Sequence, residues 1–295
     1  MKYLKPATSY EQQADLILKR GMIADRAILL RRLQAVGYYR LCAYWHPFKQ
    51  ADDTFLPGTT FEVVWNRYTF DRQLRLSVMD AMERVEVAVR TVLLTELATH
   101  AGPFAHLDVA LFPGTRSEKH ARFVDSLREE AQRSNEVFVA HFRATYDEFP
   151  DLPIWAAAEI MSFGTMLTLF NMSSNRVQKA IARRYGLTGR VLGSWLLTLN
   201  YTRNLCAHHS RLWNRALALK PLLPDEKLDA RWHGAVPIAN DRVFVVLTLL
   251  HFLVRQIAPQ TEWRERLFTL FDRFPGVPLK PMGIPDKWRT HDLWR

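Results

Sequence analysis

One stretch of the chain, VLGSWLLTLNYTRNLCAHHSRLWNR at residues 191–215, gathers two histidines, several arginines and several asparagines on an apolar helical pattern. If the stretch is a single helix, successive side chains turn by about 100° and the polar ones share one wedge of its surface. Leucines, tryptophans and Cys206 occupy the rest of the circumference. We therefore expect one side that packs on the protein and one cationic side that faces a ligand. The wedge contains Asn200, Arg203, Asn204, His208, Arg211, Asn214 and Arg215.

The chemistry open to this wedge is proton transfer beside an anion. Histidine moves protons near neutral pH, and an arginine fork holds phosphate. Asn204 and His208, four residues apart, would meet on the helix, so Asn204 could orient the imidazole or bind substrate. Arg203 and His208 diverge by about 140° on an ideal helix, so a shared substrate requires a distorted helix or a second copy of the chain. RNA cleavage fits, because the 2′-hydroxyl supplies the nucleophile and the protein only moves protons and stabilises a charged phosphorane.

The same residues have plainer interpretations. A single histidine on a helix is commonly structural, and Arg and Asn often cover a solvated face. A zinc site at Cys206, His208 and His209 is disfavoured, because adjacent helical histidines point about 100° apart and a fourth ligand is missing. Spacing alone leaves catalysis and surface decoration both open.

The composition indicates a folded protein with an anionic partner. Of 295 residues, 48% are hydrophobic, and 40 Lys and Arg against 30 Asp and Glu give a formal charge of +10. Such an excess favours nucleic acid or an acidic membrane surface. Two cysteines, Cys42 and Cys206, are too few for a disulfide framework and indicate a reducing compartment.

Neither a signal peptide nor a membrane span is expected. The first residues, MKYLKPATSYEQQ, lack the apolar run of a signal peptide. The longest uncharged apolar stretch, residues 243–254, covers only about half to two-thirds of a bilayer. We therefore expect a cytoplasmic protein without membrane contacts.

Helical periodicity covers most of the chain and strand-like alternation is absent, which predicts an all-α fold. Ser9 and Gln12 predict a capping box, and Thr59 with Glu62 predicts the start of the longest helix. A nearly apolar helix over 153–171 contains Glu159, which we expect to pair with an arginine of the 191–215 helix. The predicted helices cover two runs within 9–36, then 59–101, 117–133, 134–146, 153–171, a short run after 173–175, 191–218, 241–258 and 261–274.

Three parts are expected along the chain. They are an N-terminal helical extension over 1–58, a main helical domain over 59–275 and a tail over 276–295 packed on it by tryptophans. The segment GYYRLCAYWHPF, residues 37–48, mixes aromatic and basic side chains that could stack unpaired bases. A hydrophobic hinge that docks the first helices is the favoured interpretation, because aromatics at this density usually pack.

Several segments resemble one known family. RNLCAH, residues 203–208, matches the R-N-x-x-x-H form of the Rx4–6H motif of HEPN ribonucleases. The longer run LNYTRNLCAHHSRLWNR resembles the corresponding segment of the Abi (abortive-infection, phage-resistance) family. The motif is short and weakly specific, whereas the ordered segments together span nearly the whole chain. The others are KPATSYEQQADLILKRGM, VGYYRLCAYWHPF, TTFEVVWNRYTFDRQLRLSVMDAMERVEVAVRT, PIWAAAEIMSFGTM and MGIPDKWRTHDLW.

The resemblance implies a HEPN-like helical bundle whose core is formed by the 59–101, 153–171 and 191–218 helices. It implies a homodimer that brings two Arg203/His208 sets to one basic cleft. The implied activity is a metal-independent endoribonuclease of the phage-defence or toxin type, without a cofactor, regulated by an antitoxin or a small RNA. The competing functions are a non-catalytic RNA-binding or regulatory protein and a helical scaffold with a basic surface.

The resemblance also implies roles for single residues. His208 would be the general acid and base, Arg203 the phosphate clamp and Asn204 the orienting residue. The RNA-binding residues would be His209, Arg211, Arg215 and Asn200.

Overall fold

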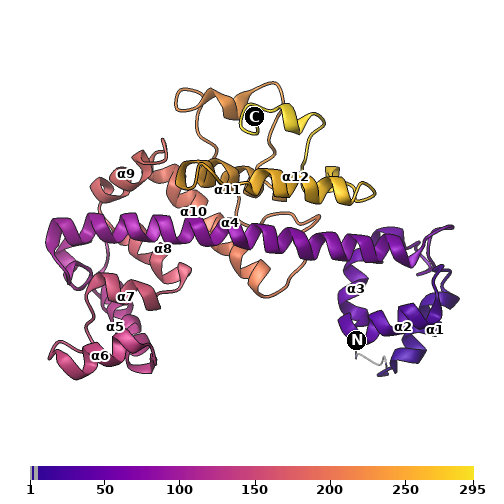
Figure 1. The fold of residues 1–295 in the computed structure, drawn as a ribbon, viewed down its shortest axis with the longest axis horizontal. Coiled ribbons are helices and arrows are strands. Elements are labelled where there is room, and N and C mark those ends of the chain that lie inside the picture. Colours follow the sequence, from indigo (N-terminus) through magenta and orange to yellow (C-terminus); the bar gives the residue numbers. More distant parts are fainter. Residues whose placement is uncertain (1, 3–5) are drawn as a thin grey trace.

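One long helix, α4 (Phe61–Ala101), spans the molecule, and most of the other helices pack directly on it (Figure 1). The computed structural model describes residue 2 and residues 6–295. With 41 residues, α4 extends about 60 Å at the usual helical rise. The expected all-α fold is confirmed, because the described residues form α-helices and short 3-10 turns and no β-strand.

Three short helices occupy one end of α4: α1 (Tyr10–Lys19), α2 (Arg26–Val36) and α3 (Tyr38–Trp45) (Figure 1). The predicted capping box is present, with the Ser9 hydroxyl accepting from the Gln12 N–H at 3.3 Å and the Gln12 side chain accepting from the Ser9 N–H at 2.8 Å. Gly37, at φ 85°, separates α2 from α3 in a conformation that favours glycine. α3 packs against α4 and buries Tyr44 and Trp45.

The opposite end and the middle of α4 carry the remaining helices (Figure 1). At the far end lie α5 (Ser117–Arg133), α6 (Val137–Thr145), α7 (Ile154–Ile160), α8 (Phe163–Met172) and α9 (Asn175–Arg183). Along the middle pack α10 (Gly189–Ala207), α11 (Val243–Ile257) and α12 (Trp263–Arg273). The helix predicted over 241–258 is α11, which is almost entirely buried and lies directly on α4. Within the described part of the chain, every helix is too short or too polar to cross a bilayer.

The predicted 153–171 helix is wrong in one respect, because it is two helices. Met161 is extended, at ψ 135°, and Ser162 caps α8 by accepting from the Thr165 N–H at 3.1 Å. The Met161 carbonyl, freed from the helix, accepts from Arg90 at 3.1 Å. A serine that offers the backbone an alternative hydrogen bond thus ends α7 and starts α8.

The ion pair expected for Glu159 is also absent. Glu159 is exposed on the outer side of α7, as is Trp155 one turn before it. It forms no ion pair within residues 6–295. The short α7 leaves this side chain in solvent, where a carboxylate needs no partner.

Two further predicted boundaries are corrected. The N-cap of α4 is Thr60, whose hydroxyl accepts from the Val63 N–H at 3.4 Å, and the buried Thr59 donates instead to the Leu56 carbonyl at 2.6 Å. The helix predicted over 191–218 is α10, which Thr188 caps and which begins at Gly189 but ends at Ala207.

The C-terminal residues close the core over α11. Trp294 is buried, stacks on Phe244 with ring centroids 5.7 Å apart and on His251 at 4.6 Å, and donates to the Thr248 hydroxyl at 3.1 Å. Burial, with smaller contributions from the charges of Arg255 and Arg264, lowers the pKa of His251 to about 4. In the folded protein this imidazole is therefore neutral at neutral pH.

Acid is expected to destabilise the protein through His251. In the unfolded chain this histidine has a pKa near 6.5, so the unfolded chain binds a proton more readily than the folded chain. The contribution of neutral His251 to the free energy of unfolding is therefore fully present above pH 6.5 and is lost as the pH drops towards 4. The loss amounts to about 3 kcal/mol. Urea denaturation of wild type and His251→Phe across this range measures it, because phenylalanine retains the stacking and removes the titration. Equal pH dependence in the two proteins would contradict the assignment.

Candidate functional site

The segment after α10 turns sharply at His208 and His209. His208 is the C-cap, with its N–H on the Asn204 carbonyl at 3.0 Å, and His209 adopts φ 56°. The His209 N–H donates to Cys206 at 3.0 Å and the Ser210 N–H to Leu205 at 2.8 Å. These two bonds form a Schellman motif with histidine where glycine is usual. A non-glycine residue held in the left-handed region is a frequent property of functional sites.

A buried carboxylate on α4 anchors the loop that follows this turn. Asp71, fully buried, accepts from the Leu212 N–H at 3.0 Å and from the Trp213 N–H at 2.6 Å. Its second oxygen accepts from the Tyr44 hydroxyl at 2.5 Å and from Arg75. The Tyr44 hydroxyl has its pKa raised, by burial first and then by the Asp71 charge, so it remains a donor. Asp71 therefore connects α3, α4 and the loop.

Arginines tie α3 to the same loop from both sides. Arg40 on α3 donates to the His209 carbonyl at 2.6 Å, and Arg211 on the loop donates to the Ala43 carbonyl at 2.7 Å. Arg215 donates to the Arg211 carbonyl at 2.7 Å. None of the three pairs with a carboxylate in the described part of the chain. Their positive charges therefore remain available to an anion.

These elements enclose an open pocket of about 660 Å³ between α3 and the loop. We call it the α3–loop pocket. Among the residues that the structure describes, three histidines and three arginines line it, and no carboxylate does. Tyr39, 92% exposed, stands at its edge and offers a free aromatic face. Its lining consists of Tyr39, Arg40, Cys42, Ala43, Tyr44, His46, His208, His209, Ser210, Arg211 and Arg215.

The pocket brings together only some of the residues predicted from the sequence. His208, His209, Arg211 and Arg215 line it, although they do so from a turn and a loop and not from one helix face. The single wedge predicted over 191–215 is thus wrong beyond Ala207.

The other predicted residues lie on α10, outside the pocket. Half-buried Arg203 donates to the exposed Asn204 side chain at 3.3 Å. The Asn200 amide lies next to α8, where a Cβ on Gly164 would be 3.7 Å from it. One chain therefore does not bring Arg203 into the pocket that His208 lines.

Sequence reasoning did not assign Tyr39, Arg40 and His46 to the site. All three come from the aromatic and basic segment 37–48, for which packing was favoured over base stacking. The segment packs through Tyr44 and Trp45, which are buried, and it leaves these three side chains exposed. The interleaved basic residues were the signal that could have identified them.

Comparison with protein families gives a match to the Abi-like protein model over residues 31–214, more than half of the chain. The chain belongs to the Abi-like protein family. The matched range starts within α2 and contains α3, Asp71 and all of the pocket lining except Arg215. Membership suggests a role in abortive infection, a defence against phage. No curated protein and no solved structure matches the sequence.

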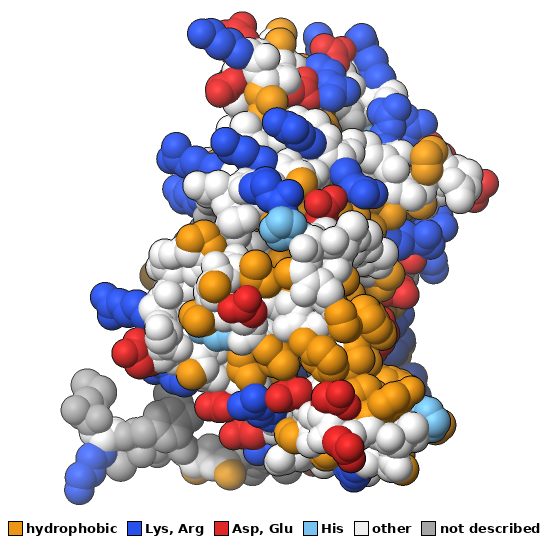
Figure 2. Space-filling model, turned by 90° about the vertical axis from the view of Figure 1, so that its left-hand side faces the viewer, with side chains coloured by type: hydrophobic (Ala, Val, Ile, Leu, Met, Phe, Trp, Pro, Cys, Tyr) orange, Lys and Arg blue, Asp and Glu red, His pale blue; other side chains and the backbone are white. Residues whose placement is uncertain are grey.

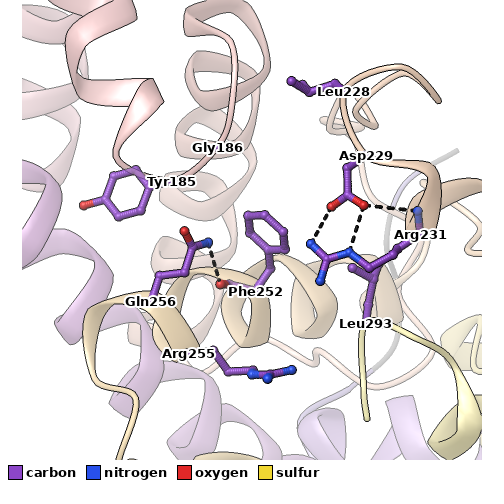
Figure 3. Close-up of a pocket in the computed structure, with 9 residues that line it drawn as sticks. All are labelled: Tyr185, Gly186, Leu228, Asp229, Arg231, Phe252, Arg255, Gln256 and Leu293. Carbon is purple, nitrogen blue, oxygen red and sulfur yellow. Dashed lines mark hydrogen bonds and ion pairs between the residues drawn. The ribbon is translucent and has the colours of Figure 1, made fainter.

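A second cavity of this Abi-like protein, about 480 Å³, lies between α11 and the loops around Tyr185 and Asp229 (Figure 3). Here Arg231 faces Asp229, with nitrogen–oxygen distances of 2.8 and 2.7 Å. The Gln256 amide donates back to the Phe252 carbonyl at 3.0 Å. Because a carboxylate already neutralises Arg231, this cavity is less suited to an anion than the α3–loop pocket.

The geometry does not favour cysteine chemistry. Burial raises the pKa of the Cys206 thiol to about 12, so it is protonated at neutral pH and is a poor nucleophile. In the part of the chain that the structure describes, no three His, Cys, Asp or Glu side chains are placed to hold a metal ion together.

Proposed function

We propose that this Abi-like protein is an endoribonuclease that acts at the α3–loop pocket through attack by the RNA 2′-hydroxyl. The observation that supports it is a pocket with three histidines, three arginines and no carboxylate. Such a lining attracts phosphate and supplies groups that ordinarily exchange protons near neutral pH.

The reaction requires one base and one acid. The base removes the proton of the 2′-hydroxyl as its oxygen attacks phosphorus, and the acid protonates the 5′-oxygen as the P–O5′ bond breaks. The products carry a 2′,3′-cyclic phosphate and a 5′-hydroxyl. His208 takes one of these roles, and His46, across the pocket on the α3 side, is the candidate for the other.

Arginines around the pocket stabilise the developing negative charge. Arg40, Arg211 and Arg215 hold the phosphate, and each keeps a guanidinium that is only partly engaged by backbone carbonyls. The buried Nε of Arg211 has no hydrogen-bond partner within the described residues. His209 and Tyr39 contact the flanking nucleotide, with the tyrosine face available for base stacking.

Arg203 and Asn204 join the site from a second copy of the chain. Within one copy they lie on α10 away from the pocket, so a homodimer is needed for Arg203 to clamp the phosphate that His208 serves. Asn204 then holds the Arg203 side chain rather than the imidazole, as their 3.3 Å contact supports.

The test is the chemistry of cleavage by the purified protein. Incubation with single-stranded RNA in EDTA is expected to give fragments with 2′,3′-cyclic phosphate ends, because the mechanism uses no metal. A matched RNA with one 2′-deoxynucleotide should resist cleavage at that linkage only. Binding of RNA without any cleavage would reject the ribonuclease and favour the competing function of a non-catalytic RNA-binding protein.

A further inference from the structure

A second group of cations lies at the far end of α10 from the pocket. Arg176, Lys179 and Arg183 follow one another at helical spacing on α9 and are exposed, as is Arg190 in the first turn of α10. We call these four residues the α9 surface. Figure 2 shows Lys and Arg side chains gathered in the upper half of the face at this end of the molecule.

The cations of the α9 surface are free to bind an external anion. None of the four forms an ion pair in the part of the chain that the structure describes. Lys179, Arg183 and Arg190 line one open cavity of about 630 Å³, and no acidic residue lines it. Positive charges that lie close together repel one another, so their clustering is favourable only when a bound anion neutralises them.

The charge distribution along the chain connects this surface with the pocket. Residues 160–224 contain no Asp or Glu and nine Lys or Arg, which is nearly all of the formal charge of +10. This stretch includes α9, α10 and the loop side of the α3–loop pocket. The excess positive charge of the protein is therefore concentrated on the elements that form the two sites.

One face of α10 joins them, exposed at Arg190, Leu197, Asn204 and His208 and half-buried at Ser194 and Tyr201. Every third or fourth residue of the helix is exposed or half-buried, from its first turn to its C-cap. At the usual rise, 19 residues extend about 28 Å, long enough to follow several nucleotides. Two members are apolar or aromatic and suit contact with bases. The face consists of Arg190, Ser194, Leu197, Tyr201, Asn204 and His208.

We propose that the α9 surface binds the phosphate backbone of a single RNA strand that runs along the exposed face of α10 into the α3–loop pocket. The inference rests on the proposed function, because it extends the substrate contacts of that same site. Phosphates bind at the α9 surface through charge, which is independent of sequence. The protein thus prefers long single-stranded RNA to short fragments.

Binding measurements test this separately from catalysis. A triple variant, Arg176→Gln with Lys179→Gln and Arg183→Gln, removes three charges from α9. The control removes three from α5, by Lys119→Gln, Arg122→Gln and Arg133→Gln, where Glu118, Asp125, Glu129 and Glu130 lie on the same helix. Both sets of substitutions are introduced into the His208→Ala protein. RNA binding is then measured in EDTA by fluorescence anisotropy at several salt concentrations, so that the labelled RNA stays intact.

The α9 variant should bind long single-stranded RNA roughly tenfold or more weakly, and its salt slope should fall by about 2, as expected for three lost phosphate contacts. The α5 control should match its parent in affinity, slope and thermal melting. Equal RNA binding by the two variants would overturn the inference. So would an α9 variant that keeps its RNA affinity but loses binding to vesicles containing anionic lipid.

A second readout keeps the two proposals apart. With His208 present, the α9 variant should cleave a dinucleotide as fast as wild type, since so short a substrate reaches only the pocket. Slower dinucleotide cleavage would show that the substitutions act through the fold and would overturn the inference. If wild type cleaves no RNA, the loss of salt slope in the α9 variant still supports the strand contact while the ribonuclease proposal fails.

Discussion

His208→Ala is expected to lower the rate of RNA cleavage by about 10² to 10⁴-fold, the usual contribution of a positioned proton-transfer group. The reason is the position of the imidazole on the α3–loop pocket, which removal of the side chain leaves otherwise intact. His208 is exposed at the end of α10, and its backbone N–H makes the capping bond. The free energy of unfolding should therefore change by no more than about 0.5 kcal/mol.

Initial cleavage rates and urea denaturation of the same preparations measure both quantities. His209→Asn is the matched control, because asparagine tolerates the left-handed backbone that His209 adopts at φ 56°. This variant should bind RNA more weakly, with little change in the rate at which bound RNA is cleaved. Undiminished cleavage by His208→Ala would reject the assignment, and a loss in His46→Ala of similar size would identify the second proton-transfer group.

The elements whose signals are local were predictable from the sequence. α4 follows from a long helical pattern that Gly102 terminates, with an N-cap misassigned by one residue. The caps at Ser9, Ser174 and Thr188 are short side chains that accept a hydrogen bond from the backbone N–H three residues later, and such bonds leave a sequence signature. The broken 153–171 helix was missed because Ser162 lies inside a continuous apolar run.

The end of α10 could not be predicted in this way. A helix often ends at a glycine or an asparagine, whereas this sequence has His208 and His209 there, and Leu212 and Trp213 further on continue the apolar pattern. What ends the helix is a set of contacts with distant residues. Asp71, Arg75 and Arg40 bind the backbone of Ser210, Leu212, Trp213 and His209 from α4 and α3. No local pattern records bonds between residues more than a hundred positions apart.

The same contacts explain why half of the candidate site was missed. The wedge predicted from the sequence included only residues of 191–215, whereas α3 contributes two tyrosines and an arginine to the pocket, and His46 directly after α3 adds a histidine. The family match over 31–214 likewise begins before the predicted boundary between the extension and the main domain. α3 belongs to the site because Asp71 and Arg211 attach it to the loop.

Replacement of Asp71 by asparagine should both destabilise the protein and disorder the loop that lines the α3–loop pocket. The carboxylate accepts four hydrogen bonds, from two backbone N–H groups, the Tyr44 hydroxyl and Arg75. An amide has one acceptor oxygen, and its NH₂ group would face other donors. Arg75, with a side chain only 6% exposed, would lose its counter-charge. A buried charge left without a partner costs about 3 to 5 kcal/mol, and we expect a loss of about 4 kcal/mol.

Urea denaturation measures this loss, and Tyr44→Phe is the control that removes one of the four bonds. It should cost about 1.5 to 3 kcal/mol, the range for a hydrogen bond to a charged group. Adding Arg75→Met to Asp71→Asn should restore part of the lost stability, because the double replacement no longer buries an unpaired cation. An Asp71→Asn protein as stable as wild type would contradict the proposed role of the carboxylate.

Asp71→Asn should also disrupt the α3–loop pocket under conditions in which the rest of the protein remains folded. Asp71 holds Leu212 and Trp213, and the adjoining Arg211 holds α3, so the loop opens when the carboxylate is replaced. Amide exchange at residues 212 and 213 should then accelerate more than exchange within α11, because the hydrogen bonds of Asp71 go to α3, α4 and the loop. RNA cleavage should fall at temperatures where the helices remain folded. Parallel loss of amide protection in the loop and in α11 would show that Asp71 stabilises the bundle as a whole and has no separate effect on the site.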